Sequence, residues 1–203
     1  GRTMEDLLYL VSDWTLGDWL LLVLWLCVFW GVVRFFLRPR FPMTFTTRAR
    51  WICDGDTFWV KHWFYRRFKV RLLGMDAPES EQRWGKESQR YLQKLIGGRT
   101  VTIHAVTRDM YGRWVARVEV GGKDVSLAMI EAGMAWPYYQ YFRTLDAKDR
   151  EIYAAAGREA QRQRKGLWRD KQPKAPWTWR EEHRTWWSRF CYWLRKILRK
   201  VFG

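Results

Sequence analysis

The chain has 203 residues, which is enough for one compact domain of ordinary size together with terminal appendages. Its formal net charge of +16 comes from 37 Lys and Arg against 21 Asp and Glu, and it favours polyanionic partners such as nucleic acid or an anionic membrane surface. A soluble basic protein without such a partner is the alternative. The three cysteines are far apart and form no CxxC pair, so they indicate neither a zinc site nor a disulfide framework.

The first predicted element is an apolar helix over residues 19–37, after an N-terminal segment of residues 1–18. No charged residue occurs from Trp19 to Val33. A helix of residues 19–37 spans about 28 Å, close to the thickness of a bilayer's hydrocarbon core. We predict a transmembrane helix rather than a buried core helix, because no soluble domain here needs so apolar a rod. A cleaved signal peptide is disfavoured, because no basic region precedes the apolar run.

Charges on the two sides of this helix predict its orientation. Four acidic residues precede it, and five arginines occur within residues 34–50. By the positive-inside rule, the large C-terminal portion faces the cytoplasm in a bacterial inner membrane, or the matrix in a mitochondrial inner membrane. The chain is therefore predicted to be a single-pass membrane protein.

After residue 43 the pattern changes to short β-rich runs and then to helices. Strands are predicted over residues 44–53, 57–64, 68–73, 99–106 and 113–120. Amphipathic helices are predicted over residues 85–96, 125–132 and 146–164, the last with Asp146 as its N-cap. Residues 44–169 are therefore predicted to form an α+β domain, a five-stranded OB-type β-barrel with about three helices.

Acidic and basic residues cluster where these strands end. Residues 54–57 read Asp-Gly-Asp-Thr, and residues 71–80 carry Arg71, Asp76 and Glu79. A second arginine, Arg113, begins a later strand. Carboxylates can hold a hard cation, a spare carboxylate can take a proton from water, and guanidinium groups bind phosphate oxygens in pairs. This combination suits the cleavage of a phosphodiester.

Electrostatics supports a cation at this cluster. Asp56 and Asp76, if both ionised and close together, repel each other, and a divalent cation is the natural counter-charge. Ligands that are all oxygen favour Ca²⁺ or Mg²⁺ over zinc. Arg71 lies within an apolar strand, where its charge is costly unless it points into a polar site. The alternative is that Arg71 forms a structural salt bridge with Asp76 or Glu79.

Five motifs occur in order along residues 44–168. They are IxDGDT at 52–57, RLLGxDAPE at 71–79, DxYGR at 109–113, the helix of residues 127–135, and the GLW ending at 166–168. In this order and spacing they resemble a staphylococcal nuclease-like (thermonuclease) domain. The resemblance implies a Ca²⁺-dependent phosphodiesterase that acts on DNA and RNA.

The resemblance also implies the roles of particular residues. Asp56 and Asp76 would hold the cation through their side chains, with the backbone carbonyl of Ala77 as a third ligand. Many family members have Thr where this chain has Ala77, a change that a carbonyl ligand tolerates. Glu79 would activate the attacking water.

Two further groups of residues would bind the substrate. Arg71 and Arg113 would grip the phosphate and stabilise the charge that develops on it. The tyrosines at positions where the family packs phosphate or base against a phenol are Tyr111, Tyr139 and Tyr141. The aromatic and basic surroundings suit stacking on single-stranded DNA or RNA, and docking on a protein or lipid neighbour is the alternative.

Residues 170–203 are predicted to be a linker followed by a basic, aromatic amphipathic helix. Pro173 and Pro176 mark the linker, and residues 177–203 combine bulky aromatic side chains with a basic face. Such a helix is typical of one that lies in the membrane interface. The alternative is a helix packed against the barrel.

Two functions are consistent with these features. The first is a membrane-anchored, calcium-dependent nuclease, with Ca²⁺ favoured over Mg²⁺ as its cofactor. The second is an accessory or structural subunit of a membrane complex, for example in the mitochondrial inner membrane, that uses the nuclease fold as a scaffold. Predicted partners are nucleic acid, the membrane through residues 19–37 and 177–203, and protein subunits of such a complex.

Overall fold

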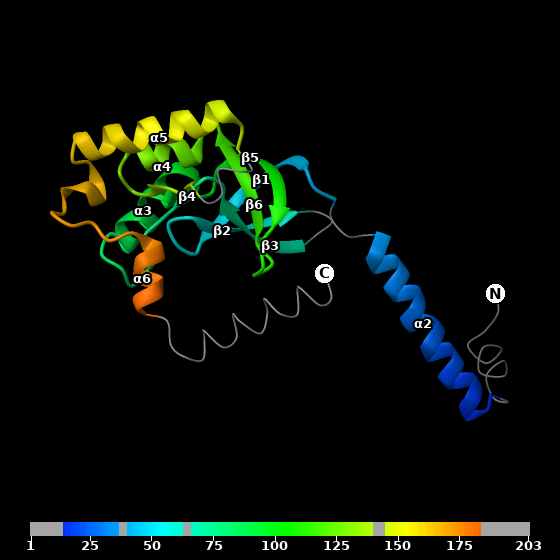
Figure 1. The fold of residues 1–203 in the computed structure, drawn as a ribbon. Helices are drawn as coiled ribbons and strands as arrows, with labels where there is room; N and C mark the ends of the chain where they lie inside the picture. Colours follow the sequence, from blue (N-terminus) through cyan, green and yellow to red (C-terminus); the bar gives the residue numbers. More distant parts are fainter. Residues whose placement is uncertain (1–13, 37–39, 63–65, 140–144, 184–203) are drawn as a thin grey trace. The chain divides into compact units, whose positions relative to one another are not determined.

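The computed structural model describes residues 14–36, 40–62, 66–139 and 145–183. The chain divides into two compact units, residues 1–40 and residues 41–203, and each is described by itself. The first contains helix α2, and the second contains the predicted β-barrel and its helices (Figure 1).

Helix α2 runs from Leu16 to Phe36. It begins three residues before the predicted start because Thr15 and Asp18 cap it: the Thr15 amide donates to Asp18 Oδ2 at 2.8 Å, and the Asp18 amide donates to Thr15 Oγ1 at 3.4 Å. The segment Leu16–Val33 is long and apolar enough to cross a membrane, and none of it is buried. A signal sequence meets the same criteria of length and composition. The helix is therefore a candidate membrane span.

Five strands form a closed barrel, which confirms the predicted fold. They are β1 (Met43–Ile52), β2 (Thr57–His62), β3 (Arg66–Leu72), β5 (Thr100–Arg108) and β6 (Trp114–Val120). Their order is β3-β2-β1-β5-β6, and β3 also pairs with β6 in parallel, which closes the barrel. A short strand β7 (Lys123–Asp124) pairs with β6 at its far end.

Alternation along the strands places the core inside the barrel. On β5, for example, Val101, Ile103 and Ala105 are buried, and the residues between them are partly exposed. One predicted boundary was wrong: the strand predicted to start at residue 68 begins at Arg66, and Arg67 pairs with Lys61 within the ladder of β2 and β3. Strand β3 consequently starts before its apolar residues do.

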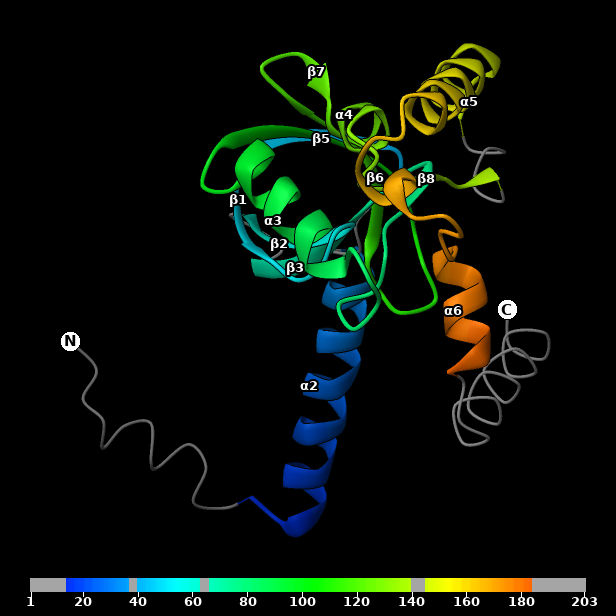
Figure 2. The same ribbon diagram turned by 90° about the vertical axis from the view of Figure 1, so that its left-hand side faces the viewer.

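The three predicted helices are present as α3 (Gly85–Ile96), α4 (Val125–Glu131) and α5 (Ala147–Arg162). Asp146 caps α5 as predicted, because its Oδ1 accepts the amide of Asp149 at 2.7 Å. Asp124 caps α4 in the same way. Figure 2, read with Figure 1, shows α5 lying over α4, with α3 on another side of the barrel.

The chain continues to pack on the domain after α5. A short 3₁₀ helix η2 (Gly166–Arg169) buries Leu167 and Trp168, and helix α6 (Pro176–Glu182) follows. The side chain of Gln82 donates to the carbonyl of Lys174 at 2.7 Å. The stretch interpreted as a linker thus contacts the nuclease-like domain directly. Most of the predicted amphipathic helix, residues 184–203, lies outside the described residues.

We expect the variant Tyr153→Phe to lose about 1 kcal/mol of the free energy of unfolding, the typical net value of one hydrogen bond. The buried Tyr153 hydroxyl donates to Asp124 Oδ2 at 2.7 Å and so joins α5 to the cap of α4. Urea denaturation of the purified chain measures the change. The control is Tyr111→Phe, at a ring that is 62% exposed. Equal stability of the Tyr153→Phe variant and the wild type would contradict this role.

Candidate active site

The site begins at the tight turn between β1 and β2. The carboxylate of Asp54 accepts the amide of Asp56 at 3.0 Å, which folds the turn back on itself. Gly55 is required here, because a Cβ at this position would lie 2.1 Å from Ser88 Oγ on helix α3. The turn therefore packs against α3, and it fixes the positions of Asp56 and Thr57 at the start of β2.

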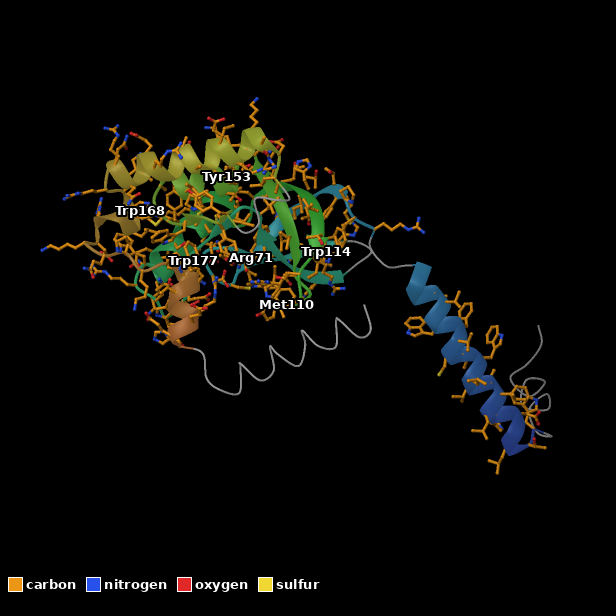
Figure 3. The ribbon with its side chains drawn as sticks, viewed as in Figure 1. Arg71, Met110, Trp114, Tyr153, Trp168 and Trp177 are labelled. Atoms are coloured by element: carbon orange, nitrogen blue, oxygen red, sulfur yellow. The ribbon has the colours of Figure 1, made fainter. Side chains whose placement is uncertain are left out.

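Arg71, labelled within the barrel domain in Figure 3, pairs with two buried carboxylates. Its Nη1 pairs with Asp56, and its Nη2 donates to Asp76 Oδ1 at 2.7 Å. Arg71 is 6% exposed and Asp76 is fully buried. The arginine in the apolar strand thus points into a polar site, as expected. The salt bridge of Arg71 with Asp76 is present, whereas Glu79 pairs with Arg180.

Strand β4 (Met75–Asp76) holds Asp76 in place. It pairs with β8 (Trp136–Pro137), a two-residue ladder that the sequence did not predict. Ala77, whose carbonyl was the expected third cation ligand, is buried directly after it. The ladder explains how a carboxylate on a short loop reaches a fixed, fully buried position.

Opposing effects act on the two acidic groups of the β1–β2 turn. Burial raises the pKa of Asp56, but Arg71 and the hydroxyl of Thr57 outweigh it, so the pKa of Asp56 lies below its ordinary value. For Asp54, burial and then the negative charge of Asp56 raise the pKa to about 7. Burial and the neighbouring carboxylate of Asp56 therefore both disfavour the charged form of Asp54.

Arg113 enters the site from the turn before β6. Asp109 accepts the amide of Arg113 at 2.9 Å and its Nε at 2.7 Å. The Nη1 of Arg113 donates to Thr57 Oγ1 at 3.1 Å, and that hydroxyl in turn donates to Asp56 Oδ1 at 2.6 Å. The DxYGR motif therefore forms a turn whose aspartate aims Arg113 at the residue beside Asp56.

The structure brings a third arginine into the site, which the sequence did not reveal. Arg180 of α6 donates from Nη2 to Asp76 Oδ2 at 2.6 Å and from Nη1 to Glu79 Oε1 at 2.7 Å. Burial disfavours its charge, but the bonds and charges of Asp76 and Glu79 outweigh this and raise the pKa of Arg180 above its ordinary value. No motif marked Arg180, because its contacts cross more than a hundred residues of sequence.

The predicted substrate tyrosines are found in different situations. Tyr111 is 62% exposed, and the Arg113 guanidinium lies 5.4 Å from the centre of its ring. Tyr139 is 59% exposed. Tyr141 lies outside the described residues. The structure thus places Tyr111 beside a predicted catalytic arginine.

The oxygen atoms of the site suit a hard cation. Within the described parts of the chain, no three His, Cys, Asp or Glu side chains gather as a metal site. The expected ligand set needs only two carboxylates, Asp56 and Asp76, and a backbone carbonyl, so it does not require such a group. The two carboxylates share the guanidinium of Arg71, so their oxygen atoms lie at one place in the fold. The donor set therefore fits Ca²⁺ or Mg²⁺.

The sequence of this domain is similar to those of known proteins. Residues 69–170 match the family described as staphylococcal nuclease homologue. An "Uncharacterized endonuclease" of Escherichia coli O157:H7 is 36% identical over 130 residues, which cover 64% of this chain and 80% of that protein. The "Staphylococcal-like nuclease CAN1" of Arabidopsis thaliana is 35% identical over 119 residues, or 59% of this chain and 35% of the plant protein.

We expect Arg71→Gln to lower the free energy of unfolding by about 3 kcal/mol, because two buried carboxylates lose their shared counter-charge. The measurement is urea denaturation in EDTA at neutral pH. Arg90→Gln is the matched control, since Arg90 pairs only across one exposed turn of α3 with Glu87. If the two variants were equally stable, the Asp56–Arg71–Asp76 cluster would not hold this end of the barrel together.

Proposed function

We propose that this chain, which belongs to the staphylococcal nuclease homologue family and is a nuclease of the hydrolase class, cleaves DNA and RNA with Ca²⁺ as its cofactor. The observation that carries the proposal is the buried cluster of Asp56, Arg71 and Asp76 beside Glu79 and Arg113. Paired carboxylates, a further carboxylate and two arginines are the groups that metal-assisted phosphodiester cleavage requires.

The cation would be held by the carboxylates of Asp56 and Asp76 and by the carbonyl of Ala77. When bound, Ca²⁺ would neutralise negative charge that develops on the phosphate. Oxygen ligands alone suit both Ca²⁺ and Mg²⁺, and the resemblance to the thermonuclease domain favours Ca²⁺.

The chain's own residues would carry the proton transfer and the binding of phosphate. Glu79, whose side chain is 34% exposed, would accept a proton from the attacking water. The side chain of Arg113 is 21% exposed and that of Arg71 is 7% exposed, so Arg113 is the more accessible to a substrate. Arg113 would therefore make the first contact with a phosphate oxygen, and Arg71 would bind deeper in the site.

A second role, as a scaffold subunit of a membrane complex, is favoured by one observation. Asp76 and Glu79 are both engaged by Arg180, so the site as it stands is closed by its own chain. A subunit whose site is held in this way would contribute its surface rather than its chemistry. Absence of cleavage by a folded, calcium-bound protein would support this role.

Membrane anchoring through α2 is part of the proposal. The helix is long enough and apolar enough to span a bilayer, and its large side chains, among them Trp25 and Trp30, are exposed. Such a surface is stable in lipid and unfavourable in water.

The nuclease proposal is tested by cleavage of labelled single-stranded DNA by the detergent-purified chain, with Ca²⁺ or with EGTA. We expect cleavage only with Ca²⁺, and a loss of about 100-fold or more in Glu79→Gln and in Arg113→Ala, since each removes a group that acts in the transition state. Glu81→Gln, an exposed position two residues from Glu79, is the control. Wild-type rates in both site variants would refute the assignment.

The anchor is tested by alkaline carbonate extraction of membranes from cells that express the full chain. We expect the wild type to stay in the membrane pellet at its full mass of 24.7 kDa. The double variant Leu24→Arg, Val28→Arg should be extracted, because each arginine at the centre of a span costs about 3 kcal/mol.

The matched control for this experiment is Leu24→Ile with Val28→Ile, which keeps the helix apolar. Recovery of a shortened wild-type chain in the soluble fraction would identify the segment as a cleaved signal sequence instead.

A further inference from the structure

Arg180 closes the candidate cation site with a bidentate contact. Its Nη2 donates to Asp76 Oδ2 at 2.6 Å, and its Nη1 approaches Asp76 Oδ1 at 3.2 Å and Glu79 Oε1 at 2.7 Å. Arg71 donates to the same Oδ1 at 2.7 Å. Both oxygens of Asp76 are therefore engaged by guanidinium groups.

A divalent cation that uses Asp76 competes with this arrangement. Such an ion binds to lone pairs on the carboxylate. The N–H groups of Arg180 already donate hydrogen bonds to those lone pairs. The positive charges of the ion and of the guanidinium also repel each other at contact distance. Arg180 and the cation cannot both occupy the face of Asp76 that looks toward Glu79.

The balance of charges at the site also indicates that Arg180 and a cation replace each other. Among the groups that pair directly, Asp56, Asp76 and Glu79 face the two guanidinium groups of Arg71 and Arg180, which leaves one negative charge in this set. Arg113 pairs with Asp109 and adds no net charge, and Asp54 lies outside this set of pairs. Removal of Arg180 leaves two, the charge that one divalent cation balances. Arg180 thus substitutes for part of the charge that the cation would supply.

Helix α6, which carries Arg180, is held by few contacts. It has seven residues, too few to be stable as a helix without support from the rest of the domain. Apart from the Arg180 bonds, Trp177 packs edge-on against Trp136 at 5.6 Å and lies 5.6 Å from the ring of Tyr138. The exposed pair of Glu182 and Lys174, which precedes α6, also spans the helix. Pro176 is the residue within α6 that is buried. Loss of the Arg180 contacts would therefore release much of what fixes α6.

We propose that α6 is a cation-responsive latch, in which Arg180 holds the site closed until a divalent cation displaces it from Asp76 and Glu79. The proposal rests on the proposed cation site. It adds Arg180, a residue outside the five motifs, as the group that controls access to this site. Binding of the cation and docking of α6 are linked, so each weakens the other by the same factor. Release of Arg180 also frees Glu79 to act on water.

The test uses the full chain in detergent micelles and calorimetric titration with CaCl₂. We expect Arg180→Gln to bind Ca²⁺ at least tenfold more tightly than the wild type, because the competing charge is gone. Arg180→Lys keeps the charge but cannot form the fork, so its affinity should lie between the two. The control is Arg169→Gln, an exposed arginine in the segment before α6. It should bind Ca²⁺ as the wild type does.

Amide hydrogen exchange gives a second readout that does not depend on activity. In the wild type, CaCl₂ should speed exchange of the α6 amides in residues 176–182, while the barrel strands stay protected. In Arg180→Gln these amides should exchange fast with or without CaCl₂. Slower exchange in α6 on addition of CaCl₂ would overturn the latch.

The outcomes separate the latch from the nuclease activity. Equal or weaker Ca²⁺ affinity in Arg180→Gln overturns the latch, and cleavage by the wild type would then leave the nuclease proposal standing. Tighter binding in Arg180→Gln without cleavage by any variant supports the latch and refutes catalysis. If neither protein binds Ca²⁺, the latch and the calcium site are both refuted.

Discussion

The buried contact of Arg71 with Asp56 and Asp76 is the interaction on which this end of the molecule depends. It joins the β1–β2 turn, strand β3 and the short strand β4 through one guanidinium. Three charges with at most 6% exposure are costly to bury, and they are retained only because each satisfies the others. The same pairing fixes the carboxylate oxygens that a cation would use and the guanidinium that a phosphate would use.

Arg180 extends this charge balance beyond the barrel. Arg180 of α6 neutralises Asp76, which would bind the cation, and Glu79, which would act on water. A site with excess negative charge needs a positive partner when no cation is bound, because unpaired buried carboxylates would shift their pKa upward or open the fold. The domain thereby remains closed and stable without the cation, at the expense of access to the site.

The many aromatic residues divide between two uses. Trp114 and Phe68 stack at 3.9 Å inside the barrel, and Trp136 of β8 meets Trp168 of η2 at 4.3 Å. The tryptophans of α2 are instead exposed. Composition alone could not separate these uses, because burial depends on which elements meet. Tryptophans that face lipid or a partner are therefore expected on α2 and at other exposed positions, not in the core.

The sequence by itself determined the strands, the helices, the closed barrel and the motif residues, because alternation, capping and turn glycines act over short stretches of chain. A salt bridge of Arg71 with Asp76 or Glu79 was an alternative that the sequence left open, and the structure shows the contact with Asp76. Only the tertiary structure decided that β4 pairs with β8 and that Arg180 reaches Asp76 and Glu79. These contacts join residues far apart in sequence, and they arise when the folded barrel presents unbalanced carboxylates to whatever cationic group packs beside them.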